Sequence, residues 1–182
     1  ANDGQIDLTV SGGTPCITSM SLSSHNPLHS SNGQSGIYFN IINNSAVALT
    51  ITDIAQGSYG HNAANNISIY YMPAPMNQSS TAPWIQVANA VPVTHPGGTF
   101  AAPAYSAPVA LSLAVVIPAG ATYGFYVGGT TTVSYATATA SGPVGSVVAN
   151  DANISITSGY GGIFGAGSFS PRAPIVEVYY GD

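Results

Sequence analysis

Residues 111–128, LSLAVVIPAGATYGFYVG, indicate the fold class of this 182-residue chain. Two apolar segments, residues 111–117 and 122–127, flank the tripeptide Pro118-Ala119-Gly120. Proline cannot donate to a strand ladder and glycine adopts a positive φ without strain, so this tripeptide indicates a turn. We therefore predict a β-hairpin through the core, with Leu111, Leu113, Val115 and Ile117 on one face and Tyr123, Phe125 and Val127 alternating on the return strand.

Similar short segments recur on both sides of this stretch. Each combines β-branched or aromatic residues with an alternating pattern or a short apolar run, and turn residues separate it from the next. We predict strands at residues 5–10, 16–22, 37–42, 46–54, 67–72, 84–93, 130–136, 146–149, 153–157 and 174–180. We predict loops at residues 25–36, 56–65, 73–83, 95–107 and 158–170.

These signals predict an all-β fold, a jelly-roll-like β-sandwich of about ten short strands with no substantial helix. Pro-rich connections and long loops favour an open pair of sheets over an up-and-down barrel. No period of about 20 to 50 residues recurs, which argues against a propeller or a solenoid. We divide the chain into an N-terminal strand with a flexible tether, residues 1–15, and one β-sandwich domain, residues 16–182.

Charge depletion is the most unusual property of the composition. Charged residues make up 4% of the chain, against about 25% in a typical protein. The chain has no lysine, and Arg172 is its only arginine. Nucleic acid is therefore excluded as a partner, because binding it draws on many cationic contacts with phosphate. Buried surfaces between subunits are depleted in charge, so the composition fits self-association.

Export from the cell is also expected. No apolar run reaches the roughly 18 residues of a membrane-spanning helix, and we take Ala1 as the start of a secreted, extracellular protein whose signal peptide has been removed. The single cysteine, Cys16, forms no intrachain disulfide, and we favour a buried thiol over an interchain bond. Four Asn-x-Ser/Thr sequons fit an extracellular protein: Asn43, Asn66, Asn77 and Asn153.

Acidic residues that could serve catalysis are few. A glycosidase needs two carboxyl groups facing each other across a cleft, and only Asp53, Asp151 and Glu177 lie outside the termini and the first predicted strand. We favour structural roles: Asp53 at a strand end, Asp151 in an Asx turn, and Glu177 facing water between two valines. No Gly-x-Ser-x-Gly motif occurs either. We therefore predict that the chain is not an enzyme.

Metal ligands are similarly sparse. His25 and His29 are the only close pair of histidines, and they lie in a predicted loop with no neighbouring acid or cysteine. The oxygen atoms around Asp151 are of the kind that calcium binds, but an Asx turn explains them better. We predict neither a metal nor a cofactor. For Arg172 we expect hydrogen bonds to loop carbonyls or an ion pair with one of the acids.

Aromatic residues offer the best candidates for ligand contact. Most lie in predicted strands, Trp84 and Tyr70 among them, where aromatic side chains usually pack in the core. Tyr59, Tyr105 and Tyr160 lie in predicted loops. We therefore select these three tyrosines as ligand-contact residues, suited to stacking on sugars or to a protein interface.

Four segments give the chain a family resemblance: ISIYYMPAPM, APWIQV, IPAGATYGFYV and VVANDANISITSGYGGIFGAGSFSPRAPIVEVYY. In this order they resemble an uncharacterised β-sandwich domain of large secreted bacterial surface proteins, and the IPAGATYGFYV motif is the most specific of them. The resemblance covers residues 37–180. It implies no enzymatic activity and provides no site residues. Such a domain is usually one module of a long chain, whereas here it stands with one additional N-terminal strand.

Our leading functional hypothesis is an extracellular structural subunit that polymerises into a filament or surface layer. Residues 5–10 alternate apolar Ile6, Leu8 and Val10 with polar residues, and a loose tether follows them. We predict that this strand is donated to the sheet edge of the next subunit. The alternative is a carbohydrate-binding or adhesive module of a surface protein. A viral jelly-roll capsid protein is disfavoured, because the basic arm that packages a genome is missing.

Overall fold

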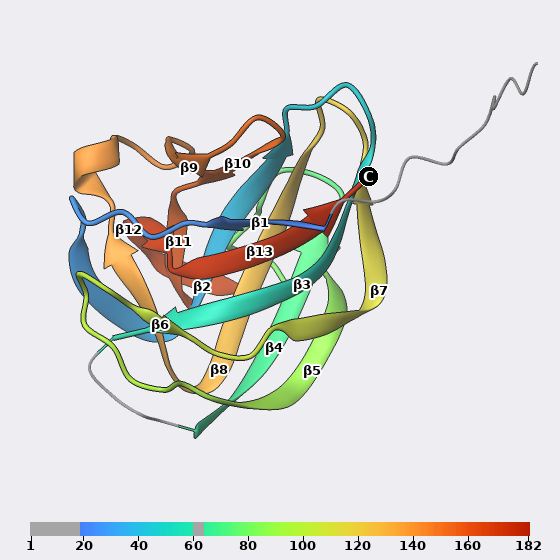
Figure 1. The fold of residues 1–182 in the computed structure, drawn as a ribbon. Coiled ribbons are helices and arrows are strands. Elements are labelled where there is room, and N and C mark those ends of the chain that lie inside the picture. Colours follow the sequence, from blue (N-terminus) through green and yellow to red (C-terminus); the bar gives the residue numbers. More distant parts are fainter. Residues whose placement is uncertain (1–18, 60–63) are drawn as a thin grey trace, which may run out of the picture.

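The structure, a computed structural model, describes residues 19–59 and 64–182. Thirteen strands and one 3₁₀ turn, Thr139–Ser141, are formed by these residues, which confirms the all-β prediction (Figure 1). The strands are β1 (Met20–Ser23), β2 (Ser30–Asn43), β3 (Leu49–Ser58), β4 (Ala64–Met72), β5 (Ile85–Thr94), β6 (Ala104–Tyr105), β7 (Val109–Ile117), β8 (Thr122–Thr137), β9 (Val147–Asn150), β10 (Ile154–Thr157), β11 (Gly159–Ile163), β12 (Ala166–Pro174) and β13 (Val176–Gly181).

The strands form two curled sheets packed face to face, as in a β-sandwich (Figure 1). The five-stranded sheet has the order β1-β13-β3-β6, with β7 also paired to β3. The eight-stranded sheet has the order β5-β4-β8-β12-β11-β2-β10-β9, with an additional pairing of β8 to β2. Every pairing among the described strands is antiparallel.

The predicted central hairpin is wrong in its pairing, although both of its strands exist. Strand β7 pairs with β3, whereas β8 pairs with β2 and β4 in the other sheet. The turn between them has the expected form, since Gly120 has φ 71° and the Ala121 N–H donates to the Pro118 carbonyl over 3.0 Å. The turn signal predicts only that the chain reverses, and here the reversal carries it from one sheet to the other.

One predicted core position on β7 is also wrong. The pairing of β7 with β3 shifts register between Ile51 and Asp53, so that β7 bulges there. Val115 and Ile117 are buried as expected, but Leu113 is 54% exposed. A bulge changes which face the following side chains point to, and residue alternation alone does not reveal it.

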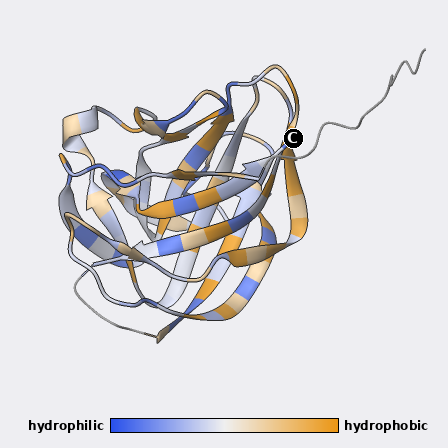
Figure 2. Cartoon of the chain, viewed as in Figure 1, coloured by the Kyte–Doolittle hydropathy of each residue, from blue (hydrophilic) through white to orange (hydrophobic). Residues whose placement is uncertain are grey.

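The main core lies between the two sheets and is built by alternate residues of the strands. Ile37, Phe39 and Ile41 of β2 are fully buried, and the Phe39 ring stacks near Phe125 of β8 with 6.0 Å between centroids. Figure 2 shows hydrophobic and hydrophilic positions alternating along β3 and β13. Burial of each such side chain contributes about 1.5–3 kcal/mol.

A glycine-rich hairpin covers part of the outer face of the eight-stranded sheet. Residues 158–170 were expected to form a loop, but they form β11, a tight turn and the first part of β12. Tyr38 alternates with core residues and so points outward, yet it is fully buried, because this hairpin covers it. The Tyr38 hydroxyl donates to the Ile163 carbonyl over 3.1 Å. A Cβ on Gly161 would lie 2.5 Å from the Tyr135 ring, so glycine is needed for this close approach.

Other boundaries differ from the prediction. Strand β2 begins at Ser30, inside a predicted loop, and the predicted strand at residues 130–136 is continuous with β8. Asp53 lies inside β3 and not at its end. The predicted strand at residues 16–22 appears as β1, while Cys16, the tether and residues 5–10 lie outside the described residues.

Candidate functional site

Three adjoining hollows form one groove on the eight-stranded sheet, here called the sheet groove. Their volumes are about 180, 220 and 130 Å³. The first and second share Gly129 and Thr130, and the second and third share Gly33 and Gln34, so the groove is continuous. Its lining residues are Asn32, Gly33, Gln34, Ser35, Asn66, Ser68, Tyr70, Tyr126, Gly128, Gly129, Thr130, Thr131, Thr132, Tyr135, Phe164, Phe169 and Arg172.

One end of the sheet groove is aromatic. Tyr70 of β4 follows the buried Ile69 and so faces away from the core. Phe164, at the tip of the β11–β12 hairpin, stacks on Tyr70 with 4.1 Å between ring centroids. Phe164 also lies 5.1 Å from the Tyr126 ring and 5.9 Å from the Trp84 ring. This end is therefore a packed aromatic cluster whose outer rings are partly exposed to solvent.

Tyr126 forms the buried floor of this aromatic end. Burial, followed by the neighbouring Tyr38 and Tyr70, raises the pKa of its hydroxyl well above the usual value. The hydroxyl donates to the Gly162 carbonyl over 3.2 Å. Tyr126 is thus held neutral and fixed, which makes it a support for the rings above it.

The middle of the sheet groove is polar. Strand β8 interrupts its ladder with β2 at residues 129–132, where the register jumps from Gly36↔Gly128 to Gln34↔Val133, while Gly129 stays paired with Ile67 of β4. The buried Asn65 holds this segment, since its Oδ1 accepts from the Thr131 N–H over 3.0 Å. The three exposed threonines of the segment line the groove, and the Thr130 hydroxyl itself donates to Asn65 Oδ1 over 3.4 Å.

The other end of the sheet groove carries Arg172, on β12. Its Cζ lies 6.0 Å from the Tyr135 ring centroid and 5.9 Å from the Phe169 ring centroid, within cation–π range. Its Nη1 donates to the Pro171 carbonyl over 2.9 Å, the kind of carbonyl contact that we expected. Its Nε is buried and makes no hydrogen bond in the structure. Burial raises the pKa of Tyr135, and Arg172 opposes this shift.

The three tyrosines selected from the sequence do not line the sheet groove. Tyr59 is half-buried, and its hydroxyl donates to the carbonyls of Asn32 and Tyr135; desolvation is the main cause that raises its pKa to about 12. Tyr105 lies in β6. Its hydroxyl oxygen is 2.5 Å from Ser23 Oγ, and burial raises the pKa of this tyrosine. Tyr160 lies in β11 opposite Tyr38 of β2. Their contact role stays a prediction.

The aromatic residues of the sheet groove were not selected from the sequence, because most of them lie in predicted strands, where aromatic side chains usually pack in the core. The period-two pattern does contain a signal. Ser68 and Tyr70 alternate with Ile67 and Ile69, so Tyr70 falls on the face opposite the core. Nothing in the local sequence places Phe164 over that face, because this contact depends on the folding of the β11–β12 hairpin.

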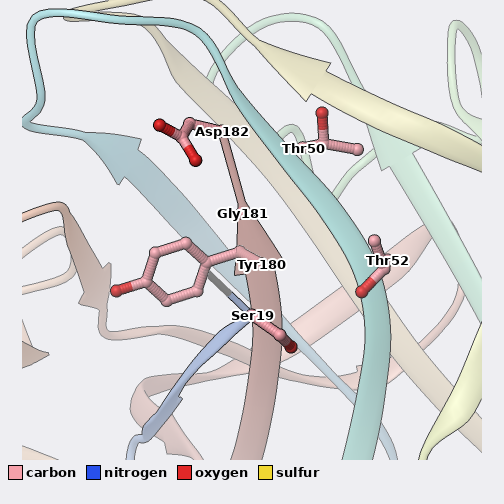
Figure 3. A pocket seen from close by; sticks show the side chains of 6 residues that line it. All are labelled: Ser19, Thr50, Thr52, Tyr180, Gly181 and Asp182. Carbon is pink, nitrogen blue, oxygen red and sulfur yellow. The ribbon is translucent and has the colours of Figure 1, made fainter. Parts of the chain in front are cut away.

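A second hollow, of about 170 Å³, lies on the five-stranded sheet (Figure 3). It is lined by Ser19, Thr50, Thr52, Tyr180, Gly181 and Asp182. The two threonines lie on one side of the end of β13, and the Tyr180 ring projects to the other side (Figure 3). Among the residues that the structure describes, Asp182 is the only acid in its lining, and no histidine, lysine or cysteine lies beside the hydroxyls of the serine and the threonines.

Two of the acids considered for catalysis, Asp151 and Glu177, have hydrogen-bond partners within the fold. Asp151 Oδ1 accepts from the N–H groups of Asn153 and Ile154, each over 2.8 Å, which confirms the predicted Asx turn. Its Oδ2 accepts from the Tyr180 hydroxyl, and burial together with this bond raises the pKa of Tyr180 to about 12. Glu177 accepts from Ser21 Oγ over 2.8 Å.

The histidines do not form a metal centre within the described part of the chain. No group of three His, Cys, Asp or Glu residues that could hold a metal ion is found there. The His25 ring contacts the Phe100 ring edge-on at 5.4 Å. His29 Nε2 lies 2.6 Å from Ser141 Oγ, and burial, followed by the nearby His25, lowers the His29 pKa. None of the described helices is long and apolar enough to cross a membrane.

Comparisons with known proteins identify no family for this chain. No family model matches it, and no curated protein does. Among solved structures, a chain from the structure of infectious bursal disease virus Gx strain overlaps it with a TM-score of 0.30 and 13% sequence identity. The overlap covers 91% of this chain and 36% of the viral chain. The resemblance to bacterial surface domains stays a prediction.

Proposed function

We propose that this protein is an extracellular, non-enzymatic structural subunit that polymerises by donating its N-terminal strand. Residues 5–10 would pair with a sheet edge of the next subunit, with Ile6, Leu8 and Val10 facing that subunit. Strand addition draws affinity from backbone hydrogen bonds and register from alternate side chains. A head-to-tail contact of this kind does not close on itself and builds a filament.

The observation that carries the proposal is the apolar edge of the five-stranded sheet. Within the described chain, the only ladder partner of β7 is β3, so its other edge is unpaired. Leu113 and Val116 on β7 are 54% and 52% exposed, and Val47, just before β3, is 52% exposed. An exposed apolar edge is a template for pairing with another strand.

The position of the first described residues fits this arrangement. Ser19 directly precedes β1, which belongs to the same five-stranded sheet as β7. The eighteen residues before Ser19 could span at most about 60 Å when extended, enough to reach a neighbouring subunit. The described strands already enclose a continuous core, so the donated strand would add to an edge of a folded domain.

Deletion of residues 1–10 tests the proposal. We expect a folded monomer by light scattering and circular dichroism, with no filaments in negative-stain electron microscopy. A matched pair of full-length variants separates the strand's apolar face from its polar face: Ile6→Asp with Leu8→Asp should prevent assembly, whereas Asp7→Asn with Thr9→Ser should not. Normal filaments from the deletion variant would refute the proposal.

The sheet groove supports a second candidate function, a carbohydrate-binding or adhesive module. Its aromatic end and its hydroxyl-rich middle combine the two kinds of group that bind sugars, a ring for the apolar face of the sugar and hydrogen-bonding groups for its hydroxyls. Tyr70 is the groove residue that we assign to stacking, in place of the three tyrosines selected from the sequence.

A further inference from the structure

The position of Arg172 defines the ligand class of the sheet groove more narrowly. We propose that the sheet groove binds an acidic saccharide, with a uronate carboxylate on Arg172 and neighbouring sugar units extending toward Tyr70. This inference rests on the second candidate function and is independent of polymerisation.

Arg172 has hydrogen-bonding capacity that the fold does not use. A guanidinium carries five N–H donors, and the described structure shows hydrogen bonds from this one to the adjacent Pro171 carbonyl and to the Tyr135 side chain. The Tyr135 and Phe169 rings both lie within cation–π range of it. A planar, partly desolvated and pre-oriented guanidinium suits bidentate binding of a carboxylate.

Arg172 is the only Arg or Lys residue of the chain, whose net charge is −5, and it lies in this groove. An arginine that serves only the fold would be expected to have its buried donors satisfied. Here the buried Nε has no acceptor in the structure. Arg172 lines the end of a hollow that also contains Asn32 and Gln34, whose amides can bind a carboxylate or an adjacent hydroxyl.

The rest of the groove favours a saccharide over an acidic peptide. From Arg172 the lining passes through the exposed residues Thr130, Thr131 and Thr132 before it reaches the aromatic end. The Thr130 hydroxyl already bonds within the fold, whereas the other two threonines can bond to sugar hydroxyls, and a pyranose ring can pack on Tyr70. An acidic peptide could also bind the cation, but it brings fewer hydroxyl groups to this part of the groove than a saccharide does.

Calorimetry with trigalacturonate and its fully methyl-esterified form tests the inference on the full chain. We expect the wild type to bind the acid more tightly than the neutral ester. Arg172→Gln should weaken trigalacturonate binding about tenfold, the loss of one charged contact, and leave ester binding unchanged. Arg172→Lys should restore only part of the affinity, because lysine lacks the bidentate geometry. Tyr70→Ala should weaken the binding of both ligands.

The outcomes separate the two levels of the inference. If the ester binds as tightly as the acid, glycan binding stands and the acidic specificity is refuted. If neither ligand binds to a protein whose thermal unfolding is normal, both are refuted. If Arg172→Gln binds trigalacturonate normally, Arg172 does not bind the carboxylate. If the main defect of this variant is the loss of filaments, Arg172 is a subunit contact. A thermal melt of each variant confirms that it is folded.

Discussion

At the scale of single residues, this protein depends on glycines that let strands lie close to tyrosine rings. Gly161 lies against the Tyr135 ring, and a Cβ on Gly167 would be 3.0 Å from the Tyr38 ring. Such contacts leave no room for even one methyl group without displacement of a buried aromatic side chain. They explain why a segment that looks like a flexible loop forms an ordered hairpin.

Gly161→Ala is therefore expected to destabilise the fold by about 1–3 kcal/mol, the usual cost of overpacking. The added methyl group would lie 2.5 Å from the Tyr135 ring. Urea unfolding followed by circular dichroism measures the change in the free energy of unfolding. Ser168→Ala, at an exposed position of the same hairpin, should change it by less than about 0.5 kcal/mol; an equally small effect at Gly161 would show that the hairpin packs more loosely.

At the scale of elements, the two parts of the fold that matter most are the edge strand β7 and the β11–β12 hairpin. The first is an unpaired edge with half-exposed apolar residues, and the second brings Phe164 and Arg172 to the two ends of the sheet groove. They belong to different sheets. Assembly and ligand binding can therefore occur on separate surfaces of one subunit.

Lysine substitutions on β7 test its role as the acceptor edge. Leu113→Lys with Val116→Lys should leave the monomer folded, because both side chains are about half exposed, and should slow or abolish filament growth, since charged side chains protect sheet edges. Light scattering over time measures the growth. Val147→Lys, at a 47% exposed position on the edge strand β9 of the other sheet, is the matched control. Equal inhibition by this control would assign the acceptor edge elsewhere.

At the scale of the whole molecule, neutral hydrogen-bonded groups replace the charges that most proteins use. Tyrosine hydroxyls bridge distant parts of the chain: Tyr180 to Asp151, Tyr59 to Asn32, and Tyr38 to the β11–β12 hairpin. Burial is the first cause that raises the pKa of each of these three tyrosines to about 12. Stability is thus tied to the neutral form of these hydroxyls.

The pH dependence of stability follows from these shifts. An unfolded tyrosine loses its proton near pH 10, while these tyrosines keep theirs in the folded state up to about pH 12. The unfolded state then binds fewer protons, so stability is complete below pH 10 and falls as the pH rises from 10 to 12. Urea midpoints together with tyrosinate absorbance measure this. A constant midpoint over that range would contradict it.

Local sequence was enough to predict much of the secondary structure and of the core. Period-two alternation predicted the strands that became β2, β3, β4 and β13, and the Pro118-Ala119-Gly120 turn formed where expected. It also predicted the Asx turn at Asp151. These features depend on neighbours within a few residues, so local sequence is enough to predict them.

Strand pairing and the position of the sheet groove could not be predicted from local sequence. Strand pairing uses backbone hydrogen bonds that every residue supplies, so alternation shows which side chains face the core but not which strand lies alongside. That is why β7 and β8 entered different sheets. The sheet groove combines residues from β2, β4, β8 and the β11–β12 hairpin. Arg172 and Tyr70, far apart in sequence, belong to one surface because β12 and β4 lie on either side of β8 in the eight-stranded sheet.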